Sequence, residues 1–330
     1  MKAAPVRRAP LLLSRECPMV GGKTTMTIRL LNALPIAITL ALAVQPSGGL
    51  AQSAGTTSSS RPDQSETQAA EMTRQAIQLL ATKSSQAERR RAVQMLGAAA
   101  ELRQPDALFA LGALHAQGKI VKHDAKRATA LYREAARQGH LKAMNALALH
   151  MIRGDGTAQD FKGAIALLQR ASDAGLTAAT TNLGQLYLAG VGHAKDPVTG
   201  LRLLEKAAAT EDPAGVHELA VALAEGVHTR KDVERAAALF QKAADAGYSR
   251  SQYSLGILKV RGEGVPQDPV DGLKWMMIAA STANGEAKVA IQKVLNELAQ
   301  KLGGDAVGTA GEAAQIWMVR RGMRTPAFRQ

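Results

Sequence analysis

The sequence predicts an all-α fold, a right-handed α/α superhelical solenoid built from helix-turn-helix repeats of about 36 residues. Three residue types recur at that period in five units: a Gly, an Asp six residues after it and a Leu seven residues before it. A fixed period of about 20 to 50 residues is typical of solenoids. The composition agrees, because the chain of 330 residues is 46% hydrophobic but only 3% aromatic, a balance that disfavours β-sandwiches and barrels.

The recurring Gly and Asp residues are expected to be structural. Each Gly should end the first helix of its unit in the left-handed conformation, and each Asp should cap the start of the second helix. Asp196 and Asp268 precede Pro, which is favoured at the first helical position. The two sets are Gly118, Gly154, Gly190, Gly226 and Gly262, and Asp124, Asp160, Asp196, Asp232 and Asp268. These residues are therefore expected to mark helix ends and not to catalyse.

The chain before the repeats has the layout of an export signal. An uncharged run from Leu30 to Val44 follows Arg29, and small-x-small sequences follow over 49–53. The run is short for a membrane span. We expect residues 1–51 to form a signal-peptide region, cut before Gln52 or Ala54, although an uncleaved anchoring segment is the alternative. A translation start at Met26 would fit this layout, because it removes the long stretch before the run.

The remaining residues divide into three parts. Residues 52–65 are expected to form a polar linker, and 66–302 the solenoid. Within the solenoid we expect a degenerate first unit, five clear units over 105–284 and a capping helix over 286–302. Ser85 and Glu88 suggest a capping box in the degenerate unit. The last part, 303–330, should hold a C-terminal helix near 309–320 and a tail.

Catalytic, metal and nucleic-acid sites find no support in the sequence. Cys17 is the single cysteine, which excludes an intramolecular disulfide, and no Cys/His cluster has zinc-ligand spacing. His217-Glu218 lacks the second His of a zinc-protease helix, and no nucleophile motif is present. Without residues 1–51 the chain carries 35 basic and 27 acidic residues, scattered and not interleaved with aromatic residues. We expect no metal, no cofactor and no nucleic acid.

Two segments carry a resemblance to a known family. Asn182–Gly192 reads NLGQLYLAGVG, and Ser254–Asp268 reads SLGILKVRGEGVPQD. These copies resemble the Sel-one-like repeat (SLR) family, a branch of the tetratricopeptide-type α-solenoids, and five units over 105–284 follow the same pattern. Ala148 and Ala220 depart from it where the family has Gly after the Leu, and Glu211 replaces a terminal Gly. The resemblance implies a scaffold that binds other proteins on its concave face.

A concave binding face can be placed by register. Aligning the Leu residues with the tetratricopeptide-like pattern puts the first helix of each unit inside the curve, so that side chains two before or after each Leu point into a groove. These positions vary between units, as residues that recognise a partner can. The candidates, with basic residues on neighbouring turns, are Phe109, Asn145, Arg153, Thr181, Gln185, His217, Tyr253, Ile257 and Arg261. Their chemistry suits a peptide bearing acidic groups; the alternative is merely solvated helix faces.

The function favoured by these observations is an exported, non-enzymatic scaffold for protein–protein interaction, periplasmic or secreted. Its partner would be another protein or peptide, and we expect a monomer with no stable membrane span after processing. One alternative is an envelope signalling regulator or a polysaccharide- or peptidoglycan-associated factor. A cell-wall or β-lactam hydrolase is less favoured, because the resemblance suggests that activity for cysteine-rich SLR proteins and this chain lacks the cysteines.

Overall fold

A computed structural model describes residues 64–323, apart from 83, 227–228 and 284. This part of the chain is made of helices and turns without a strand. The expected signal region, the start at Met26 and the cleavage sites lie outside the described residues. The first described helix begins at Gln64, two residues inside the expected linker.

The helices form consecutive antiparallel hairpins. The degenerate unit consists of α2 (Gln64–Ala81) and α3 (Gln86–Glu101), and the Ser85–Glu88 capping box is present. The clear units are α4 (Pro105–Gln117) with α5 (Ala125–Arg137), α6 (Leu141–Arg153) with α7 (Phe161–Asp173), α8 (Thr177–Ala189) with α9 (Pro197–Ala209), α10 (Pro213–Glu225) with α11 (Val233–Asp245), and α12 (Ser249–Arg261) with α13 (Pro269–Thr282).

Two further helices complete the array. The capping helix α14 spans Gly285–Leu302 and buries Ile291 and Leu295. Helix α15 spans Gly304–Arg320, so it begins five residues before the expected start near 309. Gly303, with φ of 84°, makes the turn between the two helices, and the segment after it, rich in Ala and Gly, is helical from its first residue.

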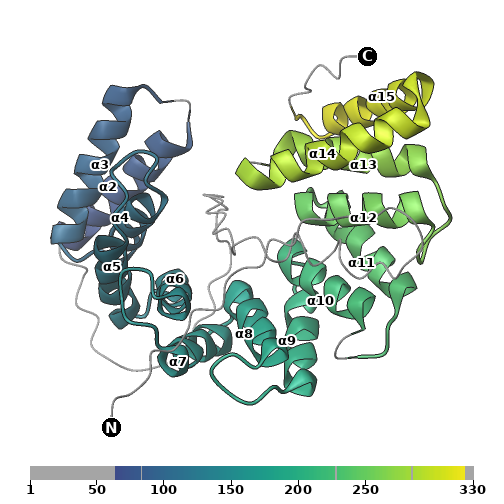
Figure 1. Ribbon diagram of the computed structural model, residues 1–330. Helices are drawn as coiled ribbons and strands as arrows, with labels where there is room; N and C mark the ends of the chain where they lie inside the picture. Colours follow the sequence, from purple (N-terminus) through teal and green to yellow (C-terminus); the bar gives the residue numbers. More distant parts are fainter. Residues whose placement is uncertain (1–63, 83, 227–228, 284, 324–330) are drawn as a thin grey trace, which may run out of the picture.

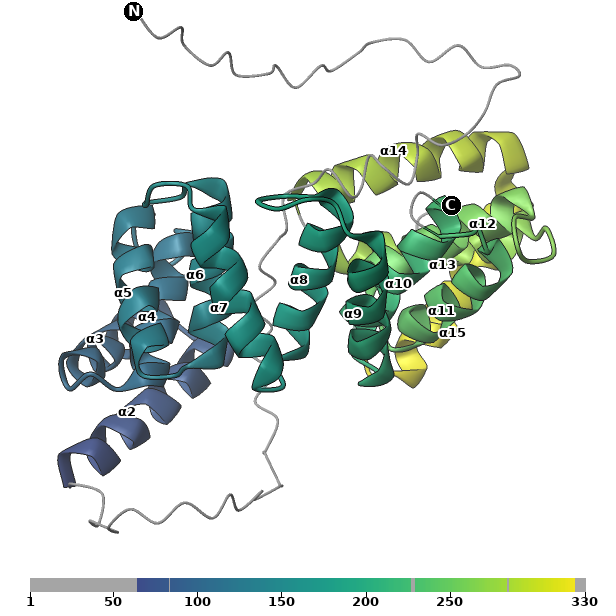
Figure 2. The ribbon, with the colours of Figure 1, turned by 90° about the horizontal axis from the view of Figure 1, so that it is seen from below.

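The hairpins follow a curve, with α2 and α3 at one end and α14 and α15 at the other (Figure 1). We call the first helix of each clear unit (α4, α6, α8, α10 and α12) its inner helix and the second (α5, α7, α9, α11 and α13) its outer helix; Figure 1 shows this plainly for α6, which faces the inside of the curve, and α7, which lies outside it. The view from below separates the hairpins α2 to α7 from α9 to α15, with α8 between them (Figure 2). The expectation of an all-α solenoid is confirmed.

The repeated Gly and Asp residues mark the helix ends as expected. Each of the five Asp residues accepts a hydrogen bond at its carboxylate from the backbone N–H three residues later, at 2.8 to 3.0 Å. Each of the five Gly residues follows its helix with φ between 61° and 74°. A side chain is disfavoured in that conformation. The ten residues therefore have a structural role.

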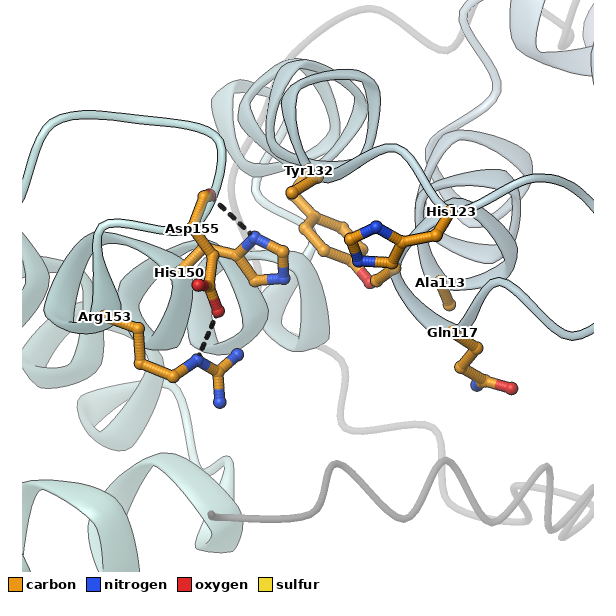
Figure 3. Close-up of a pocket in the computed structure, with 9 residues that line it drawn as sticks. Ala113, Gln117, His123, Tyr132, His150, Arg153 and Asp155 are labelled. Carbon is orange, nitrogen blue, oxygen red and sulfur yellow. Dashed lines mark hydrogen bonds and ion pairs between the residues drawn. The ribbon is translucent and has the colours of Figure 1, made fainter. Parts of the chain in front are cut away.

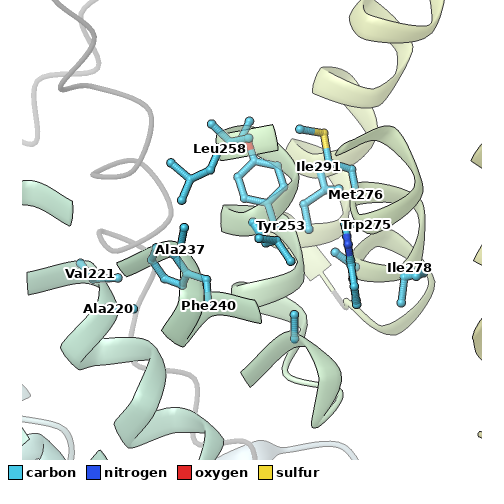
Figure 4. Close-up of a cluster of buried hydrophobic side chains, with 14 of the residues drawn as sticks. Ala220, Val221, Ala237, Phe240, Tyr253, Leu258, Trp275, Met276, Ile278 and Ile291 are labelled. Atoms are coloured by element: carbon cyan, nitrogen blue, oxygen red, sulfur yellow. The ribbon is translucent and has the colours of Figure 1, made fainter. Parts of the chain in front are cut away.

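The buried side chains fall into two clusters that meet within one helix. The first extends from Ala69 to Leu203, and the second from Leu204 to Met318. Figure 4 shows part of the second cluster, where Phe240, Leu258 and their neighbours fill the space between helices. Helix α9 thus contributes consecutive leucines to different clusters.

Candidate functional site

The inner helices leave only some of the predicted concave residues accessible. Arg153 is exposed, and Phe109, Asn145, Gln185 and Arg261 are half-buried. The other four predicted residues are buried, with exposed fractions of 6% for Thr181, 2% for His217, 5% for Tyr253 and 6% for Ile257.

Burial of these four side chains follows from the close packing of adjacent inner helices. His217 on α10, for example, lies with Nδ1 2.8 Å from Ser251 Oγ on α12, and burial lowers its pKa well below the usual value. The expectation that all side chains two positions from the Leu point into an open groove is therefore wrong at these positions. Their role in binding stays a prediction, but they have little surface to offer.

Polar contacts join the inner helices to one another. Asn182 on α8 donates from Nδ2 to Oδ1 of Asn145 on α6, at 2.8 Å. Arg250 on α12 pairs with Glu218 on α10 at 3.0 Å. Helix α8 is the most open of the inner helices in its second half, where residues 185–188 are all half-buried. The middle of the inner side therefore offers an accessible surface of amide and apolar groups.

A cavity of about 270 Å³ lies between the ends of α4, α5 and α6 (Figure 3). The inner helices α4 and α6 and the outer helix α5 supply most of its lining, and the loops after α4 and α6 supply the rest. The lining residues are Ala113, Ala116, Gln117, His123, Ala125, Tyr132, His150, Arg153 and Asp155. A neighbouring surface hollow shares His123 and Ala125 with it and adds Lys122 and Lys126.

His150 is held in one orientation by two neighbours. Its Nδ1 lies 3.0 Å from Thr129 Oγ1 and 3.1 Å from the backbone oxygen of Asp155, and Thr129 donates to that same oxygen at 2.9 Å. A carbonyl oxygen can only accept, so the hydrogen-bond network assigns the proton to Nδ1 and leaves Nε2 as an acceptor. Burial lowers the pKa of His150, which favours this neutral form. Figure 3 shows the second ring nitrogen on the side of Tyr132 and His123.

Tyr132 is a fully buried phenol without a hydrogen bond. Its side chain is 0% exposed, and its hydroxyl has no hydrogen-bond partner among the described residues. Burial raises the pKa of Tyr132, so the hydroxyl keeps its proton. The ring stands edge-on to His150, with centroids 5.3 Å apart. It also packs so closely on α4 that a Cβ at Gly112 would lie 2.8 Å from it.

The rim of the cavity is basic. Arg153 donates from Nε to Asp155 Oδ2 at 2.6 Å, which uses that carboxylate. Lys122, His123 and Lys126 form no ion pair within the described part of the chain. A second carboxylate nearby, that of Asp124, accepts a hydrogen bond from the backbone N–H of Arg127, and this bond lowers the pKa of Asp124. The balance of charge around the opening is therefore positive.

A family model for the Sel1 repeat matches residues 105–140, 141–176, 177–209, 213–248 and 249–281. The chain belongs to the Sel1 repeat family. Proteins of this family are generally scaffolds for protein–protein interaction and typically non-catalytic. The matched segments coincide with the hairpins from α4 to α13.

Solved structures agree with this assignment. One neighbour is a protective antigen of uropathogenic Escherichia coli strains that displays an SLR fold; it is 23% identical, with a TM-score of 0.60, over 79% of this chain and 58% of that one. Another is a Sel1 repeat protein from Oxalobacter formigenes, 26% identical, with a TM-score of 0.55, over 70% of this chain and 94% of that one. The chain thus spans little more than half the length of the first. No curated protein matches the sequence.

The polar cavity is specific to one pair of Sel1 repeats. Tyr132 and His150 line the cavity, and Thr129 lies within hydrogen-bond distance of His150. At the 36-residue period, the positions of these three residues are apolar in every other unit. The equivalents of Thr129 are Ile165, Leu201, Ala237 and Leu273; those of Tyr132 are Leu168, Leu204, Phe240 and Met276; and those of His150 are Leu114, Leu186, Ala222 and Leu258. A search for residues that recur in every repeat missed this site, whereas a search for polar residues at positions that are apolar in the other repeats would have found it.

The described residues offer little for other chemistry. No group of three or more His, Cys, Asp or Glu side chains within them could hold a metal ion. Within the same part of the chain, no helix combines the length and apolar character that a membrane crossing requires. The cavity can instead supply hydrogen-bond donors from Tyr132 and Arg153 and an acceptor from His150.

Proposed function

We propose that this Sel1 repeat protein is an exported, non-enzymatic scaffold that binds another protein or peptide on the inner side of its solenoid. The observation that carries the proposal is the set of five consecutive Sel1 repeats, which follow a curve and whose first helices we place on its inner side. In such an array the residues that hold the fold recur in each unit, and the side chains that differ can recognise a partner.

The accessible part of the inner side supports a peptide ligand. Phe109, Asn145, Arg153 and Gln185 combine an aromatic ring, amides and a guanidinium, and each has exposed surface. Such groups bind extended or helical segments through apolar contact and hydrogen bonds, and Arg favours acidic groups.

Photo-crosslinking in cells tests this surface. A photoreactive residue at Gln185 on α8 should capture a partner, whereas one at the exposed Ala166 on the outer helix α7 should not. The captured protein is identified by mass spectrometry. Capture from Ala166 without capture from Gln185 would place the binding surface outside the curve and contradict the proposal.

Export and a periplasmic or secreted location are part of the same proposal. They are supported by the uncharged run Leu30–Val44 after Arg29 and by the small residues that follow it. N-terminal sequencing of the protein from an envelope or secreted fraction should find Gln52 or Ala54 first. An intact residue 26 or earlier in that fraction would refute cleavage at this site.

A further inference from the structure

We infer that the cavity between α4, α5 and α6 binds a carboxylate together with the peptide N–H next to it, as found at the C-terminal residue of a peptide or at an internal Asp. The inference rests on the proposed scaffold function for the source of this group, a peptide partner. The chemistry of the site itself comes from three side chains, Tyr132, His150 and Arg153.

Tyr132 provides the first reason. A buried hydroxyl without a partner costs free energy, and such groups are rare in folded proteins. The hydroxyl of Tyr132 is buried and unpartnered within the described residues, and its ring points into the same space as His123 and His150 (Figure 3). Because its proton is retained, it can donate to an oxygen of the ligand.

Arg153 provides the charge. Its Nε is bound to Asp155, but a guanidinium has five N–H donors, and its Nη groups donate no hydrogen bond within the described residues. Lys122, His123 and Lys126 form no ion pair with any described residue and add further basic groups at the rim, and the nearby carboxylates of Asp124 and Asp155 are engaged. Donors of this kind form their strongest hydrogen bonds with a negatively charged acceptor.

His150 distinguishes a peptide from a bare anion. With its proton on Nδ1, its Nε2 needs a donor, which a simple carboxylate such as acetate lacks. An amide N–H beside the carboxylate supplies that donor. The volume of about 270 Å³ holds the end of one amino-acid residue, since a water molecule in the liquid takes about 30 Å³.

The equivalent place in the fourth and fifth Sel1 repeats provides a natural comparison. Arg261 and Glu263 form the same kind of ion pair there, with 3.8 Å between Nη1 and Oε1. Behind it lie Ala237, Phe240 and Leu258, which fill the space with apolar side chains (Figure 4). The ion pair thus occurs in the second and fifth clear units, whereas the polar interior is specific to the first and second.

Calorimetric titration of the purified full chain with short peptides tests the inference. The probes are acetyl-Gly-Gly-Ala with a free C-terminal carboxylate, acetyl-Gly-Asp-Gly amide, acetyl-Gly-Gly-Ala amide and sodium acetate. We expect one or both of the carboxylate peptides to bind at least tenfold more tightly than the amide and than acetate. The tighter of the two identifies the source, C-terminal or side-chain. The ¹³C-labelled ring resonance of Tyr132, assigned with Tyr132→Phe, should shift on binding.

Variants locate the binding within the cavity. Tyr132→Phe keeps the ring and should weaken binding of the carboxylate peptide about tenfold, as should Arg153→Ala, because each variant removes a hydrogen-bond donor to a charged acceptor. Arg170→Ala, which removes an exposed arginine on the outer helix α7, is the matched control and should leave the affinity unchanged. Circular dichroism confirms that each variant is folded.

Several outcomes would overturn the inference. Equal affinity for acetate and the peptides would show a site for any small anion, and affinity that survives both Tyr132→Phe and Arg153→Ala would place the binding elsewhere. Absence of binding by every probe would refute it as well. If Gln185 still captures its partner in the Tyr132→Phe variant at the wild-type level, the cavity inference fails while the scaffold function stands. If the wild type captures nothing from Gln185 but binds the peptides, the scaffold function fails alone.

Discussion

Leu183 is expected to be one of the most sensitive positions for stability. Its side chain on α8 is 0% exposed and belongs to the first core cluster. Leu183→Ala removes three carbon atoms, which costs about 2.4 kcal/mol at about 0.8 kcal/mol for each buried CH₂ group. A remaining void of about 60 Å³ adds about 1.5 kcal/mol at about 24 cal/mol per Å³. The free energy of unfolding should therefore fall by about 4 kcal/mol, or by about 2.5 kcal/mol if the neighbours collapse into the void.

Urea denaturation followed by two probes measures this change. Circular dichroism reports on all helices, whereas fluorescence reports on Trp275 and Trp317, which both pack in or against the second core cluster. In Leu183→Ala the dichroism transition should move to lower urea by more than the fluorescence transition, because the lost packing lies in the first cluster. Leu183→Met is the matched control, since it conserves volume and should cost less than about 1.5 kcal/mol. A loss below about 1 kcal/mol for Leu183→Ala would refute the assignment of Leu183 to the core.

Three further predictions concern the helix ends and pH. Asp268→Ala should lower the free energy of unfolding by about 1 kcal/mol, because the hydrogen bond from the N–H of Asp271 to the N-cap is lost, whereas Asp268→Asn should retain most of the stability. Loss of partner capture at an unchanged melting temperature would instead make Asp268 functional. Gly226→Ala should cost about 1 kcal/mol or more, because φ is 61° and the new Cβ would lie 2.6 Å from that of Lys231; an unchanged melting temperature would contradict this. Burial lowers the pKa of His150 and His217 below 6.5, so below that pH the unfolded chain binds protons that the folded chain does not. The free energy of unfolding should therefore fall as the pH drops below about 6.5, by up to about 1.4 kcal/mol per pH unit for each His. His217→Phe should flatten this dependence in urea titrations at several pH values, and an equal slope in the variant would show that His217 does not contribute.

The helix ends could be predicted because they depend on local interactions. Asp124 caps α5 through the N–H of Arg127, three residues away, so one sequence segment contains both partners. The exposure of the inner side chains could not be predicted in the same way, because it depends on how closely neighbouring repeats approach. Tyr253 and Ile257 occupy varied positions, yet the adjacent helices bury them.

The cavity was hidden in the sequence for a related reason. His150 and Thr129 are 21 residues apart and meet only because α6 stacks on the hairpin before it. In its own helix, Tyr132 reads as one more large side chain on the buried face. Its hydroxyl becomes informative once the fold shows that no described neighbour forms a hydrogen bond with it.

The meeting of two core clusters within α9 affects how the array can deform. Leu203 and Leu204 are adjacent in sequence but belong to different clusters, so each half of the solenoid has its own packed interior. In a curved chain of two stiff halves, a rotation at the middle changes the distance between the ends more than the same rotation elsewhere. A partner that touches both halves would therefore set the span between α2 and α15, whereas a partner held by one half would leave that span free to vary.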